Sequence, residues 1–124
     1  PIALLYIADC YYELGRYDET LKTLKDFTQR YSDKERLIPL AYEKMSMVYE
    51  KKGDIKEAMK SLETLYNLKG YIYKDFALIE YANLLEKEGR TEEAKKKYKE
   101  LTEKFPNSPF KAEAEAKLSE KKEG

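Results

Sequence analysis

The chain has 124 residues, with 24 basic and 24 acidic side chains and a formal net charge of zero at neutral pH. It has one cysteine and no histidine, so it lacks an internal disulfide, the usual zinc ligands and the imidazole base of Ser-His-Asp and Cys-His sites. Balanced charge argues against nucleic-acid binding, and no apolar run is long enough to span a membrane. We therefore expect a non-catalytic protein without a metal or cofactor.

The first predicted helix, over residues 2–14, opens with an apolar sequence. PIALLYIA, from Pro1 to Ala8, is apolar almost all round, whereas a terminal helix facing water should carry a polar face. We expect this helix to be covered, either by an upstream repeat absent from this chain or by a second copy. Cys10 has apolar neighbours and is predicted to be a small core residue rather than a reactive thiol.

Three segments of the chain share one pattern, with periods of 38 and 36 residues. They are ELGRYDETLKTLKDF, KKGDIKEAMKSLETL and KEGRTEEAKKKYKEL. Each has a glycine, a glutamate four residues later, a small residue and then apolar residues at helical spacing. The glycines are Gly15, Gly53 and Gly89.

Each glycine separates two amphipathic stretches, so each segment is predicted to form two helices joined by a short turn. Glycine can take the left-handed conformation that ends a helix without steric cost. Asp54 and Glu57 predict a full capping box. The longest loop is expected from Ser32 to Leu37. After the first helix, the predicted helices cover 17–31, 37–52, 55–68, 72–88, 91–104 and 109–122.

Small residues recur where the paired helices should meet, and larger ones recur where successive pairs should pack. The small residues are Ala8, Thr20, Ser46, Ala58, Ala82 and Ala94. The larger ones on the second helices are Leu24, Phe27, Leu62, Leu65, Tyr98 and Leu101.

The last helix is predicted to start with Ser108 as its cap and Pro109 in its first turn. Phe110, Ala114 and Leu118 give it a narrow apolar stripe on an otherwise charged surface. Such a helix would solvate the end of a repeat array. Residues 121–124 are expected to fray.

These repeats resemble the tetratricopeptide repeat family in their order of an aromatic or leucine, a small residue, an aromatic, glycine, alanine and a large apolar residue. The resemblance implies an all-α, right-handed superhelical solenoid of three helix-turn-helix units, at about 1–36, 37–71 and 72–107, with a capping helix at 108–122. We expect one domain over 1–124, as a fragment of a longer protein.

The repeats are longer than the 34 residues usual in the family, and their closing phrase KFPNSPFKAEAEAKL resembles a bacterial cell-envelope branch. That branch includes the lipoprotein of outer-membrane β-barrel assembly and the Tol-Pal coordinator. This resemblance favours a periplasmic or envelope-associated location over a cytoplasmic one. Abundant Lys and Glu are compatible with a heat-adapted source.

The family resemblance implies a concave groove lined by the first helix of each unit. Apolar anchors with an acidic rim there suit a protein or peptide that carries apolar and basic side chains. Plain packing between first helices is the alternative for each residue taken singly. The predicted groove residues are Leu5, Asp9, Tyr12, Leu40, Glu43, Met47, Glu50, Phe76, Ile79 and Asn83.

Some family members clamp a C-terminal carboxylate with basic and amide side chains in this groove. Here Leu5, Asp9, Phe76 and Glu80 stand at four of the clamp positions, and only Lys44 is basic. Two carboxylates would repel an anionic terminus, so the sequence argues against this mode of binding.

The preferred function is a non-catalytic protein–protein interaction scaffold, in a bacterial envelope assembly. One alternative is a self-association module that forms a homo-oligomer through the apolar N-terminal helix. Another is an accessory domain of a larger enzyme or regulator. The sequence leaves these alternatives open.

Overall fold

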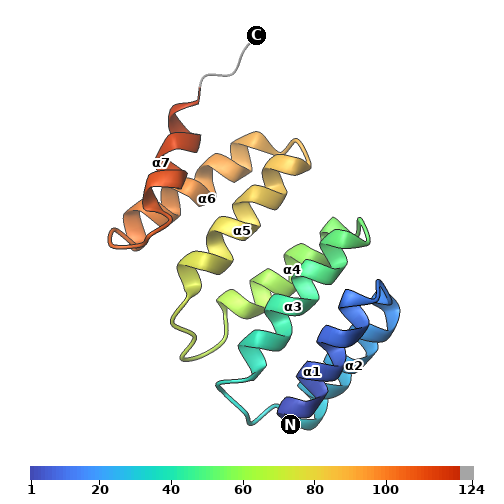
Figure 1. Ribbon diagram of the computed structural model, residues 1–124. Coiled ribbons are helices and arrows are strands. Elements are labelled where there is room, and N and C mark those ends of the chain that lie inside the picture. Colours follow the sequence, from blue (N-terminus) through green and yellow to red (C-terminus); the bar gives the residue numbers. More distant parts are fainter. Residues whose placement is uncertain (121–124) are drawn as a thin grey trace. The chain divides into compact units, whose positions relative to one another are not determined.

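The computed structural model describes residues 1–120, which contain seven α-helices and no β-strand (Figure 1). The predicted all-α helical repeat is confirmed. The chain divides into two compact units, Pro1–Tyr71 and Ile72–Gly124, and the second is described as far as Glu120. Their boundary coincides with the predicted boundary between the second and third repeats. The single domain over residues 1–124 and the right-handed superhelical arrangement both stay predictions.

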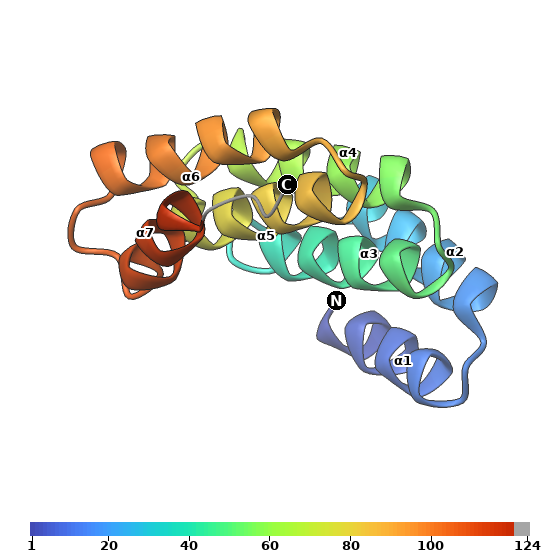
Figure 2. The same cartoon turned by 90° about the horizontal axis from the view of Figure 1, so that it is seen from above.

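The first compact unit contains two helix pairs. They are α1 (Ile2–Glu13) with α2 (Tyr17–Arg30) and α3 (Ile38–Lys51) with α4 (Ile55–Tyr66). Each helix packs against the next one along the chain. Figure 2 shows α1 and α3 on one side of this unit and α2 and α4 on the other.

The second compact unit contains α5 (Lys74–Lys87), α6 (Thr91–Lys104) and α7 (Lys111–Ser119). α6 packs against both α5 and α7. α7 is also tied to α5, because the Lys117 ammonium donates to Glu86 Oε1 at 3.0 Å. This ion pair raises the pKa of Lys117.

Glycine turns reverse the chain within each pair, as predicted. Gly15, Gly53 and Gly89 have φ values of 74°, 81° and 76°. In each turn the N–H of the residue after the glycine donates to a carbonyl five residues earlier, as from Asp54 to Tyr49 at 2.8 Å. This bond satisfies a carbonyl left unpaired at the helix end.

The predicted core is confirmed at both sets of positions. The six small residues between paired helices are all buried, and four of them have no exposed surface. The six large residues on the second helices are at most 2% exposed. Small side chains therefore let the helices of each pair approach closely, while the large ones fill the space between layers.

The helix ends differ from the predictions at two caps. Asp54 does cap α4, since its side chain accepts from the Glu57 N–H at 3.4 Å. The predicted reciprocal bond, from the Asp54 N–H to the Glu57 side chain, is wrong. The Asp54 N–H donates to the Tyr49 carbonyl, and the Glu57 carboxylate pairs with Lys60.

Ser108 does not cap the last helix, and the predicted start at Pro109 is wrong. The Ser108 hydroxyl donates to Asp75 Oδ2 at 2.6 Å and accepts from the Phe110 N–H at 3.0 Å. Ser108 therefore stabilises a turn before α7, which begins at Lys111. The predicted residues 121–122 of this helix and the predicted fraying of 121–124 lie outside the described residues.

Two further predictions are corrected. The loop at 31–37 is not the single longest, because the loop at 67–73 has the same length; α4 ends early at a turn in which Gly70 has a φ of 79°. Cys10 is exposed rather than buried. Its sequence neighbours are apolar, but its own side chain is on the outer face of α1.

The positive φ at Gly53 predicts a specific response to substitution. Gly53→Ala should lower the free energy of unfolding by about 1–2 kcal/mol, because an L-residue is strained in the left-handed region. A new Cβ would meet no atom within 4 Å, so the cost comes from the backbone and not from a clash. Urea unfolding measures this change.

Gly53→Asn is the matched control. Asparagine adds a larger side chain but tolerates the left-handed conformation better than alanine. It should therefore cost less than Gly53→Ala. Equal stability of wild type and Gly53→Ala would contradict this account of the turn.

Candidate functional site

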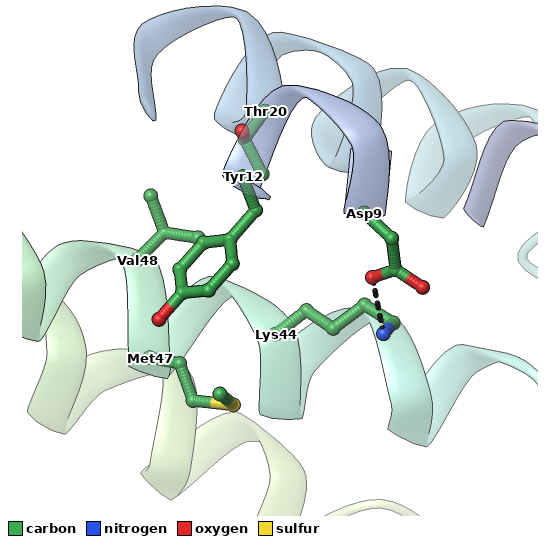
Figure 3. A pocket seen from close by; sticks show the side chains of 6 residues that line it. All are labelled: Asp9, Tyr12, Thr20, Lys44, Met47 and Val48. Atoms are coloured by element: carbon green, nitrogen blue, oxygen red, sulfur yellow. Dashed lines mark hydrogen bonds and ion pairs between the residues drawn. The ribbon is translucent and has the colours of Figure 1, made fainter. Parts of the chain in front are cut away.

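A pocket opens between α1 and α3 in the first compact unit (Figure 3). α1 contributes Asp9 and Tyr12, which lie one turn apart. α3 contributes Lys44, Met47 and Val48, at the same helical spacing. The floor is formed by Thr20 of α2.

The walls of the pocket are largely apolar. In Figure 3 the Tyr12 ring extends from α1 toward α3, with Val48 beside it and its hydroxyl end near Met47. Thr20 is buried, and its hydroxyl donates to the Arg16 carbonyl at 2.9 Å. The polar atom of the floor is thus already bonded to the backbone, and the pocket suits an apolar side chain.

An ion pair closes one side of the pocket. Lys44 Nζ donates to Asp9 Oδ1 at 2.6 Å and links α3 to α1 (Figure 3). The side chains are 30% and 47% exposed, so water screens the pair. Such a pair contributes at most about 1 kcal/mol to stability, and its main effect is to place one charge of each sign at the pocket edge.

The other predicted groove residues of the first compact unit differ in accessibility. Leu40 and Met47 are 40% and 52% exposed. Glu43 and Glu50 are half-buried, and Glu43 accepts a hydrogen bond from the Tyr71 hydroxyl at 3.0 Å. Leu5 is buried at 4% exposure, so it lies in the core and offers no surface to a partner.

In the second compact unit the predicted groove residues are mostly held by their own unit. The Phe76 ring packs against Phe110, with ring centroids 6.2 Å apart. Ile79 is 1% exposed. The amide oxygen of Asn83 accepts a hydrogen bond from the hydroxyl of Tyr98 on α6.

Tyr98 keeps its proton over a wide pH range. Burial raises the pKa of its hydroxyl well above the usual value near 10, and the charges of Glu86 and Glu113 raise that pKa further. The protonated hydroxyl can therefore donate to Asn83 and fix the orientation of that amide.

Sequence reasoning missed three residues of the pocket, namely Thr20, Val48 and Lys44. Thr20 and Val48 have the appearance of ordinary core residues. In the sequence, Lys44 stands out only as a position of the family's carboxylate clamp. The repeat alignment could have indicated that Lys44 lies near Asp9. Asp9 aligns with Met47, and Lys44 lies one turn before Met47 on the same helix.

Comparison with known families identifies the repeats. Two models, both described as tetratricopeptide repeat, match the chain: one at residues 2–34 and 76–108, the other at residues 40–70. The chain belongs to the tetratricopeptide repeat family. No curated protein matches it.

The matched spans correspond to the three helix pairs of the structure. Tetratricopeptide repeats generally mediate protein–protein interactions, so an interaction scaffold is the function class that the family indicates. The matches identify the family and no branch of it. None of the helices in residues 1–120 is both long and apolar enough to cross a membrane.

The buried Tyr98 hydroxyl predicts a pH dependence. Its pKa is raised in the folded state, so the stabilisation is complete below the unfolded pKa near 10 and is lost as the pH rises toward the folded pKa. For this one proton, stability should fall by about 1.4 kcal/mol per pH unit above pH 10. Tyr98→Phe should remove that part of the slope in urea unfolding.

Asn83→Ala provides the control. It removes the hydrogen-bond acceptor and should cost about 1 kcal/mol at neutral pH. It keeps the buried phenol, and burial is the main cause of the raised pKa, so the alkaline slope should remain. An identical slope in wild type and Tyr98→Phe would contradict the assignment.

Proposed function

We propose that the first compact unit binds an apolar side chain of a peptide segment or partner helix in the pocket between α1 and α3. The protein then acts as a non-catalytic scaffold that holds a protein partner. One observation carries the proposal: Met47, an apolar side chain 52% exposed, lies at the pocket beside Tyr12. A partner that covers Met47 would remove this apolar surface from water.

Leu40 and Met47 support recognition of an ordered segment. They are seven residues apart on α3, which corresponds to about 10 Å along the helix. Apolar side chains spaced two turns apart on a partner helix match this distance, whereas alternate side chains of an extended strand, about 6.6 Å apart, do not. The flexible thioether of Met47 would adapt to related side chains.

The charges beside Met47 support a partner with basic side chains. Glu43 and Glu50 lie four residues before and three residues after Met47, so all three share one face of α3. Asp9 uses one carboxylate oxygen, Oδ1, in its bond to Lys44. A carboxylate has about four acceptor positions, so it can receive a second donor without losing the first.

The proposed surface is smaller than the sequence-based groove. In the first compact unit it comprises Asp9, Tyr12, Leu40, Glu43, Met47 and Glu50. Phe76 and Asn83 remain candidates in the second compact unit, considered by itself. Leu5 and Ile79 are omitted, because their side chains are buried.

Met47→Glu tests the pocket directly. The probe is a synthetic amphipathic helical peptide with leucine and phenylalanine on one face and lysine at its edges, followed by fluorescence anisotropy. Met47→Glu should weaken binding at least tenfold, about 1.4 kcal/mol, because a charge would replace the apolar contact. The same peptide with glutamate in place of lysine should bind wild type more weakly.

Ile72→Glu is the matched control, because Ile72 is a different apolar side chain that is 77% exposed. It introduces the same charge at a residue that does not line the pocket and should bind the lysine peptide like wild type. Unchanged binding by Met47→Glu, with the helical circular dichroism spectrum preserved, would overturn the proposed site.

We propose a bacterial envelope assembly as the setting for this interaction. The phrase KFPNSPFKAEAEAKL and the long repeats support this setting by resemblance alone. Cross-linked affinity capture from fractionated cells, with wild type and Met47→Glu in parallel, tests it. Partners from the envelope fraction that are absent with Met47→Glu would support it, whereas partners from other fractions would contradict it.

A further inference from the structure

α1 carries a second apolar surface, separate from the pocket. Five residues, which we call the α1 stripe, follow one another at helical spacing along its outer face and onto the residue that caps its end: Ala3, Tyr6, Ile7, Cys10 and Leu14. All five are exposed, and Tyr6, Ile7 and Leu14 are 63%, 45% and 69% exposed. The opposite face of α1 buries Leu5 and Ala8.

The repeat register shows what such a face does elsewhere in the same unit. Ala3, Ile7 and Cys10 align with Ala41, Met45 and Val48 of α3, which are at most 8% exposed. This side of α3 faces α2 and borders α1: Lys52 pairs with Asp18 of α2, and Val48 lines the pocket together with residues of α1 and α2. The α1 stripe is therefore equivalent to a face that packs against a helix.

The charges at the edges of these two faces differ. On α3, Lys44 and Lys52 pair with Asp9 of α1 and Asp18 of α2. The aligned residues are Tyr6 of α1 and Leu14 at its C-terminal cap, which cannot form ion pairs. If a helix with carboxylates, like α2, packed against the α1 stripe, those carboxylates would meet Tyr6 and Leu14 instead of lysines and would stay unpaired. The α1 stripe therefore suits an uncharged apolar helix.

The chain itself contains such a helix. α1 has no lysine or arginine, whereas each of the other six helices in the described part has at least one. Of its two carboxylates, Asp9 is paired with Lys44, and Glu13 is at the edge of the stripe. Two copies of α1 would therefore place no charge at the centre of their contact.

We propose that the α1 stripe binds the α1 stripe of a second copy, in an antiparallel pair with two-fold symmetry. The stripe runs from Ala3 to Leu14, so the symmetry axis passes near its midpoint, between Ala8 and Asp9. Ile7 of each copy then packs beside Cys10 of the other. The two Glu13 carboxylates are separated by about 14 Å along the helix axis, which limits their repulsion.

The symmetry closes the assembly at two copies, because each stripe is fully used by the other. One pair of short helices buries less surface than a standard protein interface. The dimer should therefore be weak, with a dissociation constant on the order of 10 μM.

Sedimentation equilibrium over a range of concentrations tests the dimer. Wild type should show a monomer–dimer equilibrium, and Ile7→Glu should raise its dissociation constant at least tenfold, because each copy would bury a charge. Met47→Glu is the matched control: it adds the same charge to an exposed apolar position of α3 and should dimerise like wild type. It also separates the two proposals, since it should lose peptide binding and keep the dimer.

Cross-linking at Cys10 tests the antiparallel register. The two Cys10 residues should be offset by about 4.5 Å along the helix axis, and both face the contact between helices whose axes are about 8–10 Å apart. A short bis-maleimide should therefore join them. Cys10 is the single cysteine, so any cross-linked dimer joins these two residues, and Cys10→Ser should give none.

Two results would overturn the proposal. One is a wild-type protein that stays monomeric at several hundred micromolar while its helical content is intact. The other is an Ile7→Glu variant that dimerises as tightly as wild type. A dimer that depends on Ile7 but is not cross-linked through Cys10 would exclude the antiparallel register.

Discussion

The chain reversal after each first helix depends on one backbone conformation, the positive φ of a glycine. At Gly15, Gly53 and Gly89 this conformation lets the next N–H reach a carbonyl five residues back. The second helix then starts in the opposite direction and packs on the first. Because α2 returns alongside α1, α3 packs on α2 and also borders α1. The pocket exists because of this arrangement.

The fold was predictable because its determinants are local. Helical spacing, glycine position and the recurrence of small residues are all properties of short segments, and they placed the helix pairs and the core correctly. The candidate site was predicted less completely, since its polar contacts join distant residues. In the pocket, Lys44 is 35 residues from Asp9. The same difficulty applies to the turn before α7, where Ser108 is 33 residues from Asp75. Local sequence made Ser108 an apparent helix cap, but its hydroxyl donates a hydrogen bond to the distant Asp75 carboxylate.

Side-chain direction explains the remaining differences. Repeat alignment places Leu5 and Asp9 on neighbouring positions of one helix, but Leu5 points into the core while Asp9 reaches the pocket edge. Cys10 has apolar neighbours in sequence, yet its side chain is exposed on the other side of α1. A periodic pattern predicts that a face is buried, but the partner on that face determines which residues lose their contact with water.

α1 contributes residues to both the pocket and the α1 stripe, so a dimer would bring two pockets together and raise the avidity for bivalent partners. Asp9 and Tyr12 line the pocket, while the stripe lies on another face of the same twelve-residue helix. In a two-fold dimer centred on α1, the two pockets lie within a few helix diameters of each other and run in opposite directions. A partner with two copies of the recognised segment would bind the second pocket intramolecularly, at an effective concentration in the millimolar range for a short linker. Bivalent partners would thereby be retained about 100-fold longer or more than monovalent ones, without any new contact.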